Sequence, residues 1–193
     1  DVICDKPLTT TLAEAKELVT LTREKQLVFA VTLNNTGYPM VRQAREMIAE
    51  EGLGDLRVVH ASYIQDWLTK SIDAEGHKQA EWRTDPARSG ASACLADIGV
   101  HAHNLALFVT QLELSEVAAD LTTFVPGRRL DDNAHVMLRF SNGARGVLTA
   151  SGGDGPTQLR VDPMSTLAVR QKVLPLDLRI TKLGESPIEG PTR

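Results

Sequence analysis

The residues best suited to catalysis are an aspartate and a histidine in the run Asp97-Ile98-Gly99-Val100-His101. At a spacing of four residues, two side chains share one face of a helix. An imidazole, with an ordinary pKa of about 6.5, is the side chain best suited to exchange a proton near neutral pH. Asp97 also fits the N-cap of a helix, where its carboxylate would accept backbone N–H groups. The pair therefore predicts an acid–base site at the start of a helix over residues 97–110, and both roles stay open for Asp97.

Two other polar groups extend this candidate site. His103 and Asn104 follow in a helix otherwise made of Ala, Leu, Phe and Val, and burying unpaired polar groups is costly. Their presence favours a wet pocket. Lys6 comes directly after the apolar run 2–4, which predicts a strand, and ligands of α/β sheets bind outside the carboxyl ends of strands. A solvated loop lysine explains Lys6 as well.

The stretch 65–96 is long, rich in Gly, Ser, Asp, Lys and Arg, and contains Trp67, Trp82 and Arg83. Long irregular segments are often functional, and an exposed tryptophan is uncommon. The stretch therefore predicts a binding loop. A surface loop without a function is the alternative.

The elements that must position these residues follow two secondary-structure patterns. The first is a strand, helix, strand unit typical of an α/β fold, with a capping box at Thr11 and Glu14. Its elements are expected at 2–4, 12–25 and 27–33. The second contains many strands and few helices, with a hairpin turn at Ser141-Asn142-Gly143, and predicts an antiparallel sheet with helices on one face. Its helices are expected at 39–52 and 97–110, and its strands at 56–64, 114–125, 134–140, 144–150, 158–161, 166–170 and 176–181.

Composition excludes several classes of partner. The formal net charge of −4, the pI near 5.7 and the scattered Lys and Arg residues argue against nucleic acid. No apolar run approaches the roughly 18–20 residues that cross a bilayer, and the first residues lack the charged and then apolar pattern of a signal peptide, so no membrane association and a cytoplasmic location are expected. Cys4 and Cys94 lack ligand spacing, so we expect reduced core thiols and no metal site.

Three segments together resemble one known family. They are the strand-terminal Asp5-Lys6-Pro7, the run from Trp82 to Asn104 (WRTDPARSGASACLADIGVHAHN), and the run from Thr122 to Leu148. Their order and content resemble the Gfo/Idh/MocA family, named for glucose-fructose oxidoreductase and inositol dehydrogenase. The resemblance implies an α+β chain: residues 1–35 are the remnant of a Rossmann-type dinucleotide-binding domain. Residues 36–193 then form a substrate-binding and dimerisation domain with a largely antiparallel open sheet.

The resemblance also implies an activity and roles for individual residues. The family would make the chain an oxidoreductase, or a fragment of one, that transfers a hydride between NAD or NADP and a sugar, polyol or related hydroxy compound. His101 would be the general acid/base, with Asp97 beside it and Lys6 near the nicotinamide and the reacting carbon. The implied assignments are as follows: catalytic Lys6, Asp97 and His101; cofactor-binding Asp5, Lys6, Pro7, Trp82 and Arg83; substrate-binding Tyr63 and His103.

Several features depart from the family pattern. Asp5 replaces the usual glutamate, and Ser92 and Ala93 stand where glycines are common. Pro156, Pro163 and Pro175 fall in or beside expected strands. No GxGxxG turn is found, so the chain is expected to be a truncated fragment or a natural short form that binds a dinucleotide poorly by itself.

A non-catalytic reading is the alternative. A sheet with helices on only one face leaves the other face for a partner, so the chain could act as a dimerisation or binding module. A homodimer or higher oligomer through the open face is expected in either case. Candidate residues for that face are Val136, Leu138, Val147 and Leu148, although alternation alone does not say which face each side chain occupies.

Overall fold

The computed structural model describes residues 1–50, 54–152, 157–165, 171–173 and 176–182, with side chains as far as Gly152. Its N-terminal part is a small parallel unit of β1 (Val2–Cys4), α1 (Leu12–Glu24) and β2 (Phe29–Val31). Helix α1 begins at the predicted capping box: the Thr11 hydroxyl accepts the Glu14 N–H, and the Glu14 carboxylate accepts the Thr11 N–H. Both strands and the helix of this unit are confirmed, with β2 shorter than expected.

The rest of the chain is built from one sheet and a set of short helices. The helical elements are η1 (Asn34–Gly37), α2 (Pro39–Ala49), α3 (Lys78–Arg83), α4 (Pro86–Ser89), the π-helical turn η2 (Leu95–Gly99) and α5 (Val100–Thr110). The strands are β3 (Leu56–Ile64), β4 (Leu114–Thr122), β5 (Asn133–Phe140), β6 (Arg145–Ser151), β7 (Thr157–Ser165), β8 (Gln171–Val173) and β9 (Leu176–Lys182). No helix among the described residues has the length and apolar character needed to cross a membrane.

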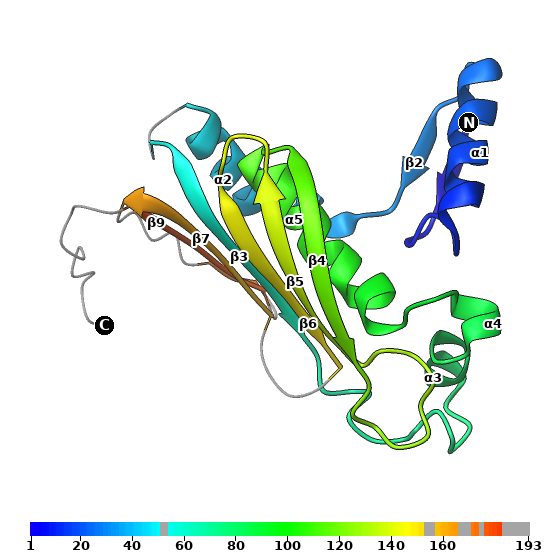
Figure 1. The fold of residues 1–193 in the computed structure, drawn as a ribbon. Helices are drawn as coiled ribbons and strands as arrows, with labels where there is room; N and C mark the ends of the chain where they lie inside the picture. The colour runs from blue at the N-terminus through cyan, green and yellow to red at the C-terminus, as the bar shows by residue number, and fades with distance from the viewer. Residues whose placement is uncertain (51–53, 153–156, 166–170, 174–175, 183–193) are drawn as a thin grey trace.

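The sheet has seven strands in the order β4-β5-β6-β3-β7-β9-β8. β3 runs parallel to β6 and β7 to β9, whereas the other four pairings are antiparallel. Helices α2 and α5 lie on one face of this sheet, and the β1-α1-β2 unit stands at its side (Figure 1). The α+β class, with a largely antiparallel open sheet covered on one face, is therefore confirmed.

The core lies between the sheet and the two long helices. Strand β5 alternates, burying Val136 and Leu138 and exposing Met137, and β6 buries Leu148 beside them. Three of the four residues that we expected on the open face, Val136, Leu138 and Leu148, therefore belong to the core. Only Val147 lies on the open face, paired with Met137. Alternation identifies two faces but does not tell which one the helices cover.

The helix that carries the acid–base pair begins earlier than expected. Helical backbone starts with the π turn Leu95–Gly99 rather than at Asp97. Asp97 is therefore inside the turn, its N–H is bonded to the Ala93 carbonyl, and the N-cap role predicted for it is wrong. A π turn inserted into a helix is often found at a functional site.

Several other boundaries also differ from expectation. The stretch 65–96 includes two short helices, α3 and α4, and the strand expected over 114–125 ends at Thr122. The hairpin turn at Ser141-Asn142-Gly143 is confirmed, with Gly143 at a positive φ of 91°. Pro163 lies within β7, where the pairing with β9 is irregular between Val161 and Ser165. The strand expected at 166–170, Pro156 and Pro175 are outside the described residues.

Candidate active site

Lys6, Asp97 and Arg83 form a three-residue ion cluster between the two parts of the molecule. Lys6 follows β1, and its ammonium nitrogen is 2.6 Å from both the Asp97 Oδ1 and the Asp97 carbonyl oxygen. The Arg83 Nε is 3.2 Å from Asp97 Oδ2, so each carboxylate oxygen accepts from one cation. All three side chains are at most 21% exposed. An ammonium has three donors, so one N–H of Lys6 remains for another oxygen.

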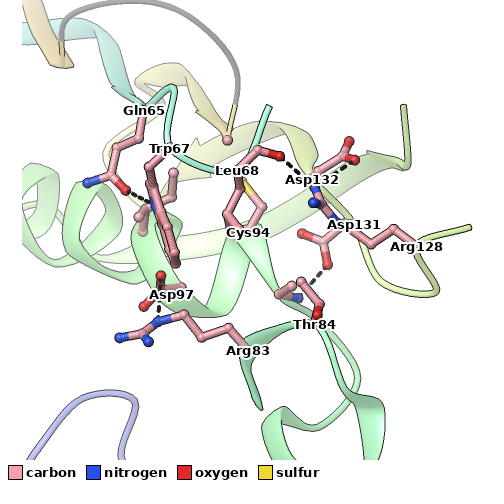
Figure 2. A pocket seen from close by; sticks show the side chains of 13 residues that line it. Gln65, Trp67, Leu68, Arg83, Thr84, Cys94, Asp97, Arg128, Asp131 and Asp132 are labelled. Atoms are coloured by element: carbon pink, nitrogen blue, oxygen red, sulfur yellow. Dashed lines mark hydrogen bonds and ion pairs between the residues drawn. The ribbon is translucent and has the colours of Figure 1, made fainter. Parts of the chain in front are cut away.

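Arg83 is held in place by aromatic rings and by an amide. Its guanidinium carbon lies 4.2 Å from the centre of the Trp82 ring and 5.7 Å from that of Trp67, both within cation–π range. Its Nη1 donates to the side-chain and backbone oxygens of Gln79. Figure 2 shows Arg83 bonded to Asp97, with the Trp67 ring directly above them. These contacts fix the guanidinium that shares Asp97 with Lys6.

His101 lies one turn beyond Asp97 and is partly buried against Tyr63, with the ring centres 6.0 Å apart. Burial lowers the pKa of His101 below its ordinary value, and the Lys6 ammonium lowers it further, while Asp97 and Asp5 act in the opposite direction. Within the described residues, its buried Nδ1 has no hydrogen-bond partner. The imidazole is therefore neutral near pH 7 and can accept a proton.

A chain of hydrogen bonds runs along the loop that follows β3. The Trp67 indole N–H donates to Gln65 Oε1 at 2.9 Å, and the Gln65 amide donates to the Tyr63 hydroxyl at 3.0 Å. Figure 2 shows the first of these bonds. Burial raises the pKa of Tyr63, so its phenol stays protonated at neutral pH. Because the Tyr63 oxygen already accepts from Gln65, its own O–H can donate to another oxygen.

A cavity of about 300 Å³ lies at the carboxyl end of β1, with Asp97 in its wall. All five residues predicted to bind a cofactor line this cavity, along with several residues that carry hydroxyl groups. Its lining includes Asp5, Lys6, Pro7, Thr9, Thr10, Trp82, Arg83, Arg88, Ser89, Ser92 and Asp97. The Thr32 hydroxyl and the Lys6 N–H both donate to Asp5, and these bonds lower the pKa of that carboxyl group. Asp5 therefore stays ionised at the cavity wall.

The predicted site residues do not all converge. Lys6 and Arg83 meet at the Asp97 carboxylate, His101 is near enough for Lys6 and Asp97 to act on its pKa, and Tyr63 lies against His101. His103 is placed elsewhere on α5, because two residues along a helix turn the side chain by about 200°. Burial lowers the pKa of His103. The assignment of His103 to the substrate side stays a prediction.

Sequence reasoning missed the residues that support the site from a distance. Arg128 is buried and bonded to the Leu68 carbonyl, to Asp73 and to Asp132. Asp131 accepts backbone N–H groups at the start of η2, the role that had been expected of Asp97. Figure 2 shows Asp131, Asp132 and Arg128 together beside Cys94. Burial raises the pKa of the Cys94 thiol to about 12, so this cysteine is inert at neutral pH.

The comparison with protein families gives two matches that together span most of the chain. Residues 41–163 match the model described as the GFO/IDH/MocA C-terminal domain. The chain belongs to the GFO/IDH/MocA family. Residues 1–33 match the model described as an oxidoreductase family with an NAD-binding Rossmann fold. The family resemblance read from the sequence is therefore confirmed.

Individual members of the GFO/IDH/MocA family show the same likeness. The levoglucosan dehydrogenase of Pseudarthrobacter phenanthrenivorans is 32% identical over 155 residues, which are 80% of this chain and 36% of that protein. An inositol dehydrogenase homolog from Azotobacter vinelandii, solved with NAD+, superposes with a TM-score of 0.77 at 30% identity, covering 81% of this chain and 40% of that one. An oxidoreductase from Sinorhizobium meliloti is 48% identical, with a TM-score of 0.66, over 80% of this chain and 39% of that one. The chain spans about two fifths of the length of these relatives.

Proposed function

We propose that this chain carries the substrate side of a nicotinamide-dependent oxidoreductase that acts on a sugar, polyol or related hydroxy compound. The observation that carries the proposal is that Lys6 and Asp97 are paired in the wall of a cavity of about 300 Å³ and that their charges act on the nearby His101. Lys6, Asp97 and His101 are the proposed catalytic residues. The cofactor-binding residues are proposed to be Asp5, Lys6, Pro7, Trp82 and Arg83.

The cavity suits one end of a dinucleotide. About 300 Å³ is at the lower limit of small-molecule sites, enough for a nicotinamide and its ribose. Thr9, Thr10, Ser89 and Ser92 offer hydroxyls, and Arg88 and Lys6 offer positive charge, in a lining suited to a ribose and a phosphate. A bound nicotinamide would supply the hydride acceptor or donor. Either NAD or NADP fits this end, because the two differ at the far ribose.

The residues of the chain divide the remaining work among them. When a secondary alcohol is oxidised, its hydroxyl proton must leave, and the neutral His101 is the base for that proton. The free N–H of Lys6 can donate to the same oxygen and stabilise the negative charge that develops there. Asp97 fixes Lys6 through two contacts of 2.6 Å, and it also favours the imidazolium after proton transfer. Tyr63 offers a donor for a second substrate hydroxyl.

The substrate class is supported by the relatives. The chain is similar to a levoglucosan dehydrogenase, to a D-xylose 1-dehydrogenase and to an inositol dehydrogenase homolog solved with NADH and myo-inositol. A compound with adjacent hydroxyls also suits a site in which Lys6, His101 and Tyr63 offer separate hydrogen-bonding groups. We propose His103 as a further substrate contact.

The proposal is tested in the complete gene product that contains this chain. The purified protein is assayed with NAD+ and NADP+ against myo-inositol, levoglucosan and D-xylose by following the reduced cofactor. His101→Ala should lower kcat by about 10²–10⁴-fold on the best substrate, the usual contribution of a general base. Glu46→Ala, at an exposed position of α2 away from the open sheet face, is the control and should keep wild-type turnover. Full turnover in His101→Ala would refute the proposal.

The second candidate is a dimerisation or binding module, and the open sheet face favours it. Met137 is 64% exposed there and Val147 is 37% exposed. We propose a homodimer or higher oligomer through this face. Within each chain we propose two domains, residues 1–35 and residues 36–193. Sedimentation of the chain and of Met137→Glu at high micromolar concentration tests the pairing, because a charge at an apolar contact should favour the monomer. A strict monomer in both cases would contradict it.

Titrating the chain with NADH and following its fluorescence tests cofactor binding directly. Saturable binding supports the oxidoreductase, whereas no binding by these residues alone favours the module or a fragment of the oxidoreductase. We also propose a cytoplasmic location. Cys4 and Cys94 are both free thiols, as is usual in a reducing compartment.

A further inference from the structure

The start of the helix that carries Asp97 and His101 is held by a residue from a distant loop. Asp131 precedes β5, and its carboxylate accepts the N–H of Ala93 and the N–H of Leu95, each at 2.8 Å. The Asp131 carbonyl also accepts the N–H of Cys94, at 3.0 Å. One residue thus binds three consecutive backbone N–H groups. Asp131 is itself only 6% exposed.

These bonds act at the start of the helix, where the preceding residues supply one side-chain acceptor, the Ser92 hydroxyl, which accepts the Ala96 N–H at 3.3 Å. The first N–H groups of a helix have no partner within it, and Cys94, at the N-cap position of η2, makes no side-chain capping bond. Asp131 supplies the missing acceptors, and its negative charge is favourable at a helix N-terminus. The direction in which η2 leaves Cys94 therefore depends on Asp131.

The position of Asp97 follows from that direction. Asp97 comes two residues after Leu95, inside the same π turn, and meets Lys6 and Arg83 at 2.6 and 3.2 Å. The turn packs against the sheet at Gly99, where an added Cβ would lie 3.4 Å from the Ala150 Cβ. A change in the anchor at Leu95 would be carried directly to the Asp97 carboxylate.

We propose that Asp131 is a positioning residue for the acid–base site, which it serves by clamping residues 93–95 so that Asp97 reaches Lys6 and His101 stays packed against Tyr63. The role deepens the proposed function, on which its catalytic meaning rests. Asp131 lies in the loop before β5 and acts through the backbone of η2. It is therefore distinct from the residues that would touch the substrate.

The neighbouring residue offers a matched control. Asp132 is also 6% exposed, and its carboxylate likewise accepts two backbone N–H groups, those of Phe124 and Val125, at 2.8 and 2.9 Å. The bonds of its carboxylate stay within the loop 123–132, where it also pairs with Arg128. Loss of either carboxylate should weaken folding, but only Asp131 touches the helix of the site.

The experiment compares Asp131→Asn with Asp132→Asn in the full chain. In Asp131→Asn one oxygen is replaced by an NH₂ group, which faces a backbone N–H as donor against donor. The His101 ring is followed by NMR titration and assigned with His101→Gln. The charged and titratable groups around this ring are Lys6 and Asp5 after β1, Asp97 on η2 and Tyr63 on β3.

We expect Asp131→Asn to raise the titration midpoint of His101 by roughly half a pH unit, because a loosened helix start lets water reach the ring. Asp132→Asn should leave the midpoint unchanged, although both variants lower the melting temperature. Equal midpoints in wild type and Asp131→Asn, or equal shifts in the two variants, would overturn the proposal. If Asp131→Asn does not fold, Asp131→Glu, which keeps the charge but displaces the oxygens, takes its place under the same criteria.

This readout does not depend on turnover. A shifted midpoint together with full activity of His101→Ala in the gene product would leave the clamp intact and remove the proposed function. An unshifted midpoint together with an inactive His101→Ala would remove the clamp and leave the proposed function intact. The two proposals can therefore fail separately.

Discussion

The β1-α1-β2 unit and the seven-stranded unit solve the problem of burying apolar surface in different ways. In the larger unit, α5 alone contributes four buried residues to a core shared with α2 and the sheet. In the smaller unit α1 buries none, and Ile3 in the middle of β1 is 79% exposed. The larger unit contains its own core, whereas the smaller one presents apolar side chains that its own residues do not cover.

The candidate site is made from both units. Lys6 comes from the smaller unit, and Asp97, Arg83 and His101 come from the larger. The contact between them includes the Lys6 ion pair and a close approach of Gly90 to Thr10. The geometry of the site therefore depends on how firmly a unit with little core is held against one that has a core.

The largest expected effect compares one core residue from each unit. Leu105 is 1% exposed, and Leu105→Ala should lower the free energy of unfolding by about 2–5 kcal/mol through lost burial and the cavity left behind. Ile3→Ala should change it by about 0.5 kcal/mol or less, since Ile3 is exposed. Urea denaturation measures both. A cost for Ile3→Ala as large as that for Leu105→Ala would mean that the apolar face of the smaller unit is covered in solution.

A smaller effect is expected at the contact between the units. Gly90 has a φ of 88°, and a Cβ there would come within 2.9 Å of the Thr10 carbonyl oxygen. Gly90→Ala should therefore cost about 1–3 kcal/mol, through backbone strain and a displaced contact. Gly127→Ala is the matched control, because Gly127 has a φ of 80° and open space around it. Thermal unfolding of the two variants separates strain from contact, and equal losses would argue against a tight junction at Thr10.

The smallest expected effect is a pH dependence confined to the larger unit. The pKa values of His101 and His103 are lowered from 6.5, so between the folded and unfolded values the unfolded chain binds more protons. The stability due to the neutral histidines is complete above about pH 6.5 and declines as the pH falls through the folded pKa values. In the double variant His101→Gln/His103→Gln, the free energy of unfolding should change less between pH 7 and pH 5 than it does in the wild type. A wild-type stability that is constant over this range would contradict the lowered values.

Part of the fold could be predicted because its signals are local. The capping box at Thr11 and Glu14 set the start of α1, and the Asn142-Gly143 pair set the hairpin turn between β5 and β6. The assignment of faces was not local. Val136 and Val147 alternate equally well in sequence, and only the position of α5 decides that the first is core and the second is open.

The candidate site divides in the same way. Asp97 and His101 could be paired from a spacing of four residues, and Lys6 from its place at a strand end. The anchors of the helix could not be predicted, because Asp131 is more than thirty residues from the backbone it binds and no residue type is specific to a π turn. Arg83 was expected near a cofactor, but its bond to Asp97 depends on how α3 packs.

The parallel pairing of β3 with β6 has a consequence for the order of folding. These two strands are neighbours at the centre of the sheet, yet the whole segment from Gln65 to Ala144 separates them in the chain. That segment contains α3, α4, the π turn and α5, which are the elements that build the site. Closing so long a loop is entropically slow, and non-local pairing of this kind limits the folding rate. The sheet centre and the residues proposed for chemistry should therefore assemble in the same late step.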